Sequence, residues 1–221
     1  LKVGRYLKPY YLLCLGDLMD SYSISAHDKD PDRANRFGWE LDQVNIALDE
    51  LDDLKAKDKR FVEGNHEDRV RREVMKNHSL NGVLSIPKML RLKERGWKYT
   101  PYKEHDRIGK VYQTHDVGGS ARNHKFKALD LYQHSVLTGH DHRMIYVVEN
   151  NALGTTPKLS AGFGWLGDVE QVDYMTKAKA RASWAQGFGV GYLDSSTGYF
   201  YTQPVPILQN YSCVVEGKLF R

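Results

Sequence analysis

Residues 61–68 read FVEGNHED, and this stretch decides the fold that we expect. A short apolar run ends abruptly in a Gly-Asn-His turn, where an amide and an imidazole emerge together. Three other segments have the same form, a β-prone run that ends in a metal-capable side chain: GDLMD at 16–20, QTHD at 113–116 and GHDHR at 139–143. Together they predict polar groups gathered at one edge of a sheet.

The composition is that of an ordinary globular protein. The 221 residues are 41% hydrophobic and 27% charged, and no apolar run approaches the ~20 residues that span a bilayer, so we expect no membrane partner. Cys14 and Cys213 are too few for a disulfide framework, which favours a reducing, cytoplasmic location. The net charge of +4 is compatible with phosphate-bearing substrates and does not establish nucleic-acid binding. The oligomeric state is left open.

The order of the patterns predicts an α/β protein whose first half alternates strands and helices. The apolar run 10–15 is typical of a strand buried on both faces. Apolar residues then recur every three or four positions over 37–54, which predicts an amphipathic helix. Residues 60–63 form the next expected strand, and the charged segment 67–77 the next helix.

The second half is expected to be mostly β. Runs at 97–102 and 108–114 predict two strands joined by a polar turn, before a helix over 120–133 and a strand over 135–138. Short β-prone runs separated by Gly, Asn, Ser and Thr then predict a meander, over 144–148, 158–161, 187–193 and 199–203. No linker interrupts the chain, so we expect one domain over residues 1–221.

Each candidate residue also has an ordinary explanation. Asp17 suits a ligand-binding crevice at a sheet edge, and equally a turn or a cap. Asp20 fits a solvated surface, His66 an exposed turn, and His115 a hydrogen-bonded histidine at a strand end.

The histidine pair is the second strongest signal. His140 and His142 would lie on one side of an extended segment and face one centre. With Asp17, Asn65 and His115 they make a mixed oxygen and nitrogen donor set, suited to transition metals with open positions for water.

These four motifs, in this order, resemble those of the calcineurin-like metallophosphoesterase superfamily over roughly residues 10–148. The resemblance implies a four-layer αββα sandwich of two mixed β-sheets flanked by helices. It also implies a hydrolase, a phosphatase or phosphodiesterase, that cleaves phosphate mono- or diesters with a metal-bridging hydroxide.

The resemblance assigns the metal ligands. Asp17 would bridge two divalent ions, Asn65, His115 and His140 would hold one of them, and His142 would help to hold the other. We expect Mn²⁺, with Fe, Zn, Ni or Mg as alternatives.

His66 would not bind metal in this scheme. It would contact the phosphoryl oxygen or the leaving group, oriented by a hydrogen bond that its ring donates to Asp20. Arg143, which directly follows His142, is the cation that we expect to reach the substrate phosphate.

One family motif is missing. No Asp-x-His occurs in the 221 residues, and only 15 residues precede Gly16. In the family that motif ends the first strand, and residues 1–8 resemble the end of the helix that follows it. We therefore expect an N-terminally incomplete domain that lacks its first strand, with the first metal site reduced to Asp17 and His142.

Two alternatives stay open. One is a nuclease of the same fold that acts on DNA or RNA. Its phosphate contacts would come from basic clusters that also read as solvated helix faces: Arg69, Arg71, Arg72 and Lys76; Arg122, His124, Lys125 and Lys127; and Lys177, Lys179 and Arg181. Trp165, Tyr174 and Trp184 are expected to anchor the core or loops. The other alternative is a non-catalytic interaction module, favoured only by the missing motif. Substrate choice is expected to lie in 21–34 and 162–184.

Overall fold

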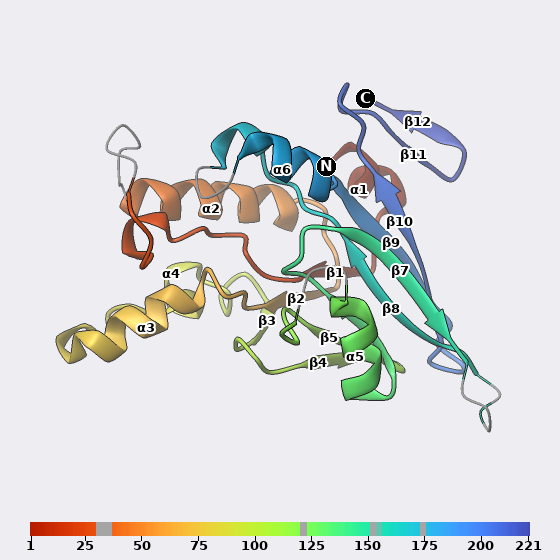
Figure 1. The fold of residues 1–221 in the computed structure, drawn as a ribbon, viewed down its shortest axis with the longest axis horizontal. Coiled ribbons are helices and arrows are strands. Elements are labelled where there is room, and N and C mark those ends of the chain that lie inside the picture. The colour runs from red at the N-terminus through yellow and green to blue at the C-terminus, as the bar shows by residue number, and fades with distance from the viewer. Residues whose placement is uncertain (30–36, 120–122, 151–153, 155, 173–175) are drawn as a thin grey trace. The chain divides into compact units, whose positions relative to one another are not determined.

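The computed structural model describes residues 1–29, 37–119, 123–150, 154, 156–172 and 176–221. The chain divides into two compact units, Leu1–Glu104 and His105–Arg221. The described residues form six α-helices and twelve β-strands (Figure 1), which confirms the expected α/β class. The four-layer sandwich and the single domain stay predictions.

The first unit is built on a three-stranded parallel sheet in the order β1-β2-β3. Cys14 is in register with Phe61, and Phe61 with Tyr99. In chain order the elements are α1 (Lys2–Leu7), β1 (Tyr11–Cys14), α2 (Phe37–Asp52), β2 (Asp58–Val62), α3 (Asp68–Lys76), α4 (Ile86–Met89) and β3 (Trp97–Thr100). Two 3₁₀ turns complete it, Tyr22–Ile24 and His78–Leu80. The predicted strand–helix alternation of this half is confirmed.

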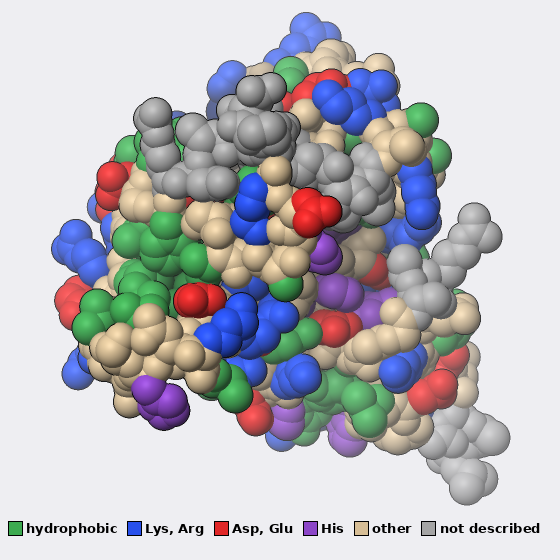
Figure 2. All heavy atoms as spheres, turned by 60° about the vertical axis from the view of Figure 1, so that its left-hand side comes forward, with side chains coloured by type: hydrophobic (Ala, Val, Ile, Leu, Met, Phe, Trp, Pro, Cys, Tyr) green, Lys and Arg blue, Asp and Glu red, His purple; other side chains and the backbone are tan. Residues whose placement is uncertain are grey.

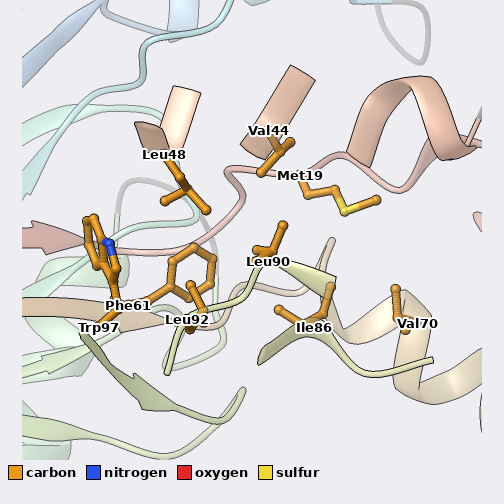
Figure 3. Packing of buried hydrophobic residues seen from close by; sticks show 9 residues of the cluster. All are labelled: Met19, Val44, Leu48, Phe61, Val70, Ile86, Leu90, Leu92 and Trp97. Carbon is orange, nitrogen blue, oxygen red and sulfur yellow. The ribbon is translucent and has the colours of Figure 1, made fainter. Parts of the chain in front are cut away.

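A hydrophobic core forms between α2 and the sheet. Figure 3 shows Val44 and Leu48 of α2 pointing toward Phe61 of β2 and toward Leu90. Phe61, Leu48 and Leu90 are fully buried. Because three-residue and four-residue steps place these α2 side chains on one face, the predicted amphipathic helix has the partner that its apolar face needs. The core fixes the end of β2, from which the Gly-Asn-His turn starts.

The expectation that the first strand is buried on both faces is wrong. All four residues of β1 are half-buried. Within the described sheet β1 lies at the edge and pairs only with β2, so it lacks the cover that a central strand receives on both sides.

The second unit is built on a five-stranded mixed sheet in the order β4-β5-β6-β8-β7. Its strands and helices are β4 (Asp106–Ile108), β5 (Val111–Thr114), α5 (His124–Tyr132), β6 (Ser135–Thr138), β7 (Met144–Glu149), β8 (Lys158–Phe163), α6 (Lys177–Ser183), β9 (Gly187–Leu193), β10 (Phe200–Pro206), β11 (Cys213–Val215) and β12 (Lys218–Phe220). A 3₁₀ turn spans Val169–Gln171. Helix α5 packs against β6, β7 and β8, and the β9–β10 hairpin lies beside β7 and β8 (Figure 1).

Two predictions for this half are corrected. The run 108–114 is not one strand, because Gly109 adopts φ 56° and turns the chain between β4 and β5, which pair antiparallel. The later strands are not a simple meander either. β8 lies between β6 and β7, parallel to the first and antiparallel to the second, so the chain crosses over one strand position.

The sequence pattern also missed β11 and β12, and it gave no bounds for α6, where it indicated only a basic helix face. The helix expected over 120–133 is observed as α5, and residues 120–122 lie outside the described part of the chain. The same holds for residues 30–34 of the predicted specificity loop and for Tyr174. Among the described residues, none of the helices has the length and apolar character that crossing a membrane requires.

Candidate functional site

In the first unit the candidate residues lie on two turns that follow the parallel strands β1 and β2. The chain leaves β1 through Gly16 and Asp17, whose φ angles are 91° and 57°. This left-handed backbone carries the Asp17 carboxylate to the second turn, where its Oδ1 accepts the backbone N–H of His66 at 3.0 Å. Asp17 therefore already ties the two turns together through one carboxylate oxygen.

Glu67, which the sequence analysis did not single out, holds these two turns from beneath. Its side chain is fully buried. Oε2 accepts the backbone N–H groups of Asp17 and Gly64, each at 2.9 Å, and Oε1 accepts that of Met19 at 2.9 Å. A buried carboxylate needs several donors to offset its lost hydration, and three main-chain groups supply them. The Gly-Asn-His-Glu motif thus contains its own support.

Gly64 has a steric role at the same place. A Cβ on this residue would overlap the Asp17 carboxylate, the Asp17 backbone nitrogen and the Glu67 carboxylate. Only glycine lets the two turns approach this closely.

His66 contacts Asp20, as the family resemblance implies. Its Nδ1 lies 2.8 Å from Asp20 Oδ1, and its Nε2 lies 4.0 Å from Asp17 Oδ2. Arg69 fixes Asp20 in turn, because its guanidinium donates to the Asp20 carboxylate at 3.0 Å and to the Asp20 carbonyl at 2.7 Å. The imidazole is half-buried, and both of its ring nitrogens have an acidic neighbour.

Asn65 lies between Gly64 and His66 and is half-buried. Its backbone carbonyl accepts a hydrogen bond from the Arg72 guanidinium at 3.0 Å. The turn is therefore held on its outer side by α3 as well as from beneath by Glu67.

In the second unit His115 and His140 follow neighbouring parallel strands. β5 and β6 are in register at Thr114 and Thr138, so the residues after them emerge at the same sheet edge. The rings of His115 and His140 lie 5.3 Å apart between centroids, in an edge-to-face arrangement. His115 is buried and His140 is half-buried. The prediction that strand ends bring these two histidines together is consistent with this geometry.

The geometric argument for His140 and His142 is wrong, although both residues belong to one turn. The chain after β6 is not extended there, since His140 and His142 adopt φ angles of 67° and 54°. The ring contacts of the two residues differ. His140 faces His115 and, at 5.9 Å between centroids, His124.

His142 instead faces two tryptophans. Its ring stacks on Trp165 at 5.3 Å and meets the edge of Trp184 at 4.4 Å, and the two indoles are 4.9 Å apart. Backbone bonds hold the same place, because Ala185 N–H donates to the His142 carbonyl at 3.0 Å and Trp165 N–H donates to the Ala185 carbonyl at 3.0 Å. The expectation that Trp165 and Trp184 act as anchors is consistent with these contacts.

The second unit also contains a buried polar group that the sequence analysis missed. His124 and Lys125, at the start of α5, are fully buried, which contradicts the interpretation of this cluster as a solvated helix face. His124 Nε2 lies 3.0 Å from Asp116 Oδ1, and this contact keeps the pKa of the Asp116 carboxyl below its usual range. Burial lowers the pKa of the Lys125 ammonium, whose Nζ lies 3.1 Å from the buried Asp141. Arg122 of the same cluster lies outside the described residues.

The other basic clusters are consistent with structural salt bridges. Asp68 pairs with Arg71 at 2.6 Å and with Arg72 at 3.1 Å along α3. Glu170 pairs with Lys177 at 2.9 Å and also with Arg181. On the face drawn in Figure 2, basic and acidic side chains are interspersed. Neither α3 nor α6 therefore offers an uncompensated row of cations.

Arg143 lies directly before β7 and is half-buried. Its carbonyl accepts Gly164 N–H at 3.1 Å. Within the described residues no carboxylate pairs with its guanidinium, so this cation is compatible with an anionic ligand.

The chain matches no known protein-family model, and none of the curated proteins matches it either. The functional argument therefore rests on the residues and on their geometry within each unit.

Proposed function

We propose that this chain is a metal-dependent phosphoesterase, a hydrolase of phosphate mono- or diesters of the calcineurin-like type. The observation that carries the proposal is the 2.8 Å contact between Asp20 and His66, on a turn that the Asp17 carboxylate also contacts. A carboxylate that fixes one imidazole nitrogen is a common way to aim the other nitrogen at a reacting group.

The proposed ligands fit divalent transition metals by their chemistry. Carboxylate and amide oxygens with three imidazoles suit Mn²⁺, and also Fe, Zn or Ni, better than they suit Mg²⁺. Two ions are proposed, held by Asp17, Asn65, His115, His140 and His142. These five residues are proposed together because of the order of the four motifs along the chain. When bound, such ions lower the pKa of water and neutralise phosphoryl charge.

The remaining chemistry falls to the protein's own side chains. His66, aimed by Asp20, would donate a proton to the oxygen that leaves phosphorus. Arg143 would neutralise a non-bridging phosphate oxygen. For the first ion only Asp17 and His142 are proposed ligands in these 221 residues, so we expect that ion to bind more weakly than the second.

A nuclease is the weaker alternative, because the cations of α3 and α6 already pair with Asp68 and Glu170. A substrate with one phosphate needs few protein cations, whereas a polyanion gains affinity from many unpaired ones. A non-catalytic module is disfavoured, because a surface that only binds a partner does not need an imidazole oriented by a carboxylate, as His66 is by Asp20. A cytoplasmic location is part of the proposal, supported by the free thiols of Cys14 and Cys213.

The test is hydrolysis of an aryl phosphate and of the matching bis-aryl phosphate with added Mn²⁺. We expect turnover of at least one ester, which His66→Ala reduces and Lys179→Gln, on the exposed face of α6, leaves intact. Mn²⁺ binding followed by electron paramagnetic resonance tests the ligands separately. Asp17→Asn and His140→Ala should each weaken the binding of the same Mn²⁺ ion. A protein that binds Mn²⁺ yet cleaves neither ester nor any oligonucleotide would refute the enzymatic proposal in favour of an interaction module.

A further inference from the structure

Lys125 is a buried cation for which the proposed reaction has no use. Its side chain is fully buried at the start of α5. Nζ donates to the Thr138 hydroxyl and lies 3.4 Å from the Thr138 carbonyl, at the last residue of β6. It also lies 3.1 Å from Asp141 Oδ2. A lysine is rarely buried without a partner, because its desolvation costs several kcal/mol.

The partner, Asp141, stands between the two proposed metal ligands of the turn after β6. It is itself buried, with 7% of its surface exposed. The residues on either side of it, His140 and His142, both adopt left-handed backbone conformations. Such conformations are unfavourable for a residue with a side chain, and they persist where the surroundings hold them. The Asp141 side chain is the inward anchor between these two strained positions.

The space for Lys125 depends on Gly162 of β8. A Cβ on Gly162 would overlap Cε and Nζ of the lysine. The absence of a side chain on the sheet therefore lets the ammonium reach β6 and Asp141. The arrangement involves α5, β6 and β8 at once.

The same ammonium also reaches the other side of the turn. Nζ of Lys125 lies 3.3 Å from Nδ1 of His124. His124 in turn lies 3.0 Å from Asp116, whose Oδ1 is 4.0 Å from Nε2 of His140. Lys125 thus contacts Asp141, which lies within the turn, and His124, whose ring neighbours that of His140.

We infer that Lys125 is a positioning residue whose ion pair with Asp141 holds the His140–His142 turn so that both imidazoles are presented to metal. The inference rests on the proposed function only for what the two histidines bind. A buried ion pair adds little net stability compared with an apolar pair, so its effect should appear in the conformation of the turn rather than in stability alone.

The test compares Lys125→Met with the wild-type protein by NMR of the histidine rings, without metal. In the wild type the His142 ring protons should be shifted by the ring currents of Trp165 and Trp184, which stack on it and meet its edge. Lys125→Met should remove much of that shift and move the His140 signals. The matched control is Lys177→Met, which breaks an exposed pair with Glu170 and should leave both histidines unchanged.

Calorimetric titration with Mn²⁺ gives a second measure. We expect Lys125→Met to weaken Mn²⁺ binding about 10- to 100-fold, as for groups that orient metal ligands. In the double variant Lys125→Met/Asp141→Asn the melting temperature should recover in part, because no unpaired charge stays buried, while the histidine signals stay displaced. Recovery of both would mean that the pair contributes stability only, and would overturn the inference.

Native histidine signals in Lys125→Met would overturn it as well. If Lys125→Met does not fold, Gly162→Ala decides, since it displaces the lysine and keeps every charge; unchanged histidine signals there refute the positioning role. If the wild type binds no Mn²⁺, the proposed function fails, and the NMR comparison still decides the role of Lys125.

Discussion

The carboxylate of Asp20 lies 2.8 Å from Nδ1 of His66, which commits that ring nitrogen to the protein. The other nitrogen, Nε2, is the one that a substrate would meet. The guanidinium of Arg69 also contacts the Asp20 carboxylate, at 3.0 Å. The proposed chemistry therefore depends most directly on the geometry of this pair among the contacts of the first unit.

Removal of the imidazole should affect the reaction far more than binding. We expect His66→Ala to reduce kcat for an alkyl phosphate about 10²- to 10⁴-fold, because a poor leaving group needs a proton. With an aryl phosphate the loss should be smaller, since the leaving oxygen is a weaker base. Steady-state kinetics on the two esters measures both values.

Asp20→Asn should reduce kcat about 10-fold and leave KM nearly unchanged, because it misaligns His66 without removing it. Arg71→Gln is the control, since Arg71 is exposed and its ion pair is with Asp68 of the same helix. For the His66→Ala variant, equal losses of kcat on the alkyl and aryl phosphates would argue against His66 as a proton donor and for a role in binding.

Glu67→Gln should destabilise the first unit. An amide offers one oxygen to the backbone donors of Asp17, Met19 and Gly64, and it turns an NH₂ group toward at least one of them. We expect a loss of about 1–3 kcal/mol in the free energy of unfolding, as for buried donors left unpaired. Urea unfolding followed by circular dichroism measures it, with the exposed Glu50→Gln as the matched control. A free energy of unfolding unchanged within error would contradict this, and would show that water accepts the hydrogen bond that the lost carboxylate oxygen accepted.

Trp165 and Trp184 should report on metal bound at His142. Ni²⁺ quenches nearby indoles, and both rings contact the imidazole. We expect tryptophan emission to fall as Ni²⁺ is added, with a midpoint roughly tenfold higher in His142→Ala. Trp97→Phe, in the core of the first unit, should leave the titration curve unchanged. Equal quenching in His142→Ala would place the ion elsewhere.

Asp58 should make stability depend on acid. Hydrogen bonds from Arg60 lower the pKa of its carboxyl below the ordinary value of 3.8, with a further contribution from Lys98. Because the folded pKa is the lower one, this stabilisation is complete above pH 3.8 and is lost as the pH falls through the folded value. Asp58→Asn should therefore cost about 1 kcal/mol at pH 7 and progressively less below pH 3.8. Urea unfolding across this pH range measures the difference, and the exposed Asp42→Asn should show no such trend.

The strand ends could be predicted because they follow from local pattern. A β-prone run that stops before Gly and a polar residue predicted β6 with its observed bounds, and predicted β2 to within two residues at its start and one at its end. Parallel pairing then places the residues after β5 and β6 at one edge, which is why His115 and His140 lie close together.

The buried polar contacts could not be predicted, because they depend on space made by distant residues. In α5 the apolar Phe126 is 48% exposed while the neighbouring Lys125 is fully buried, the reverse of what hydrophobic periodicity predicts. The reason is the gap at Gly162, 37 positions further along the chain. Likewise the two-residue step of His140 and His142 suggested an extended segment, and only the backbone angles reveal the turn.

Glu67 holds the two turns of the first unit through three main-chain N–H groups. These three hydrogen bonds do not involve the side chains at positions 17, 65 and 66. The hydrogen bonds to Glu67 that shape the two turns are thus separate from the side chains that the turns carry. The ligand at position 65 could therefore be exchanged for one that suits another metal without loss of these bonds, whereas Asp17 also accepts the His66 N–H and so belongs to the scaffold as well.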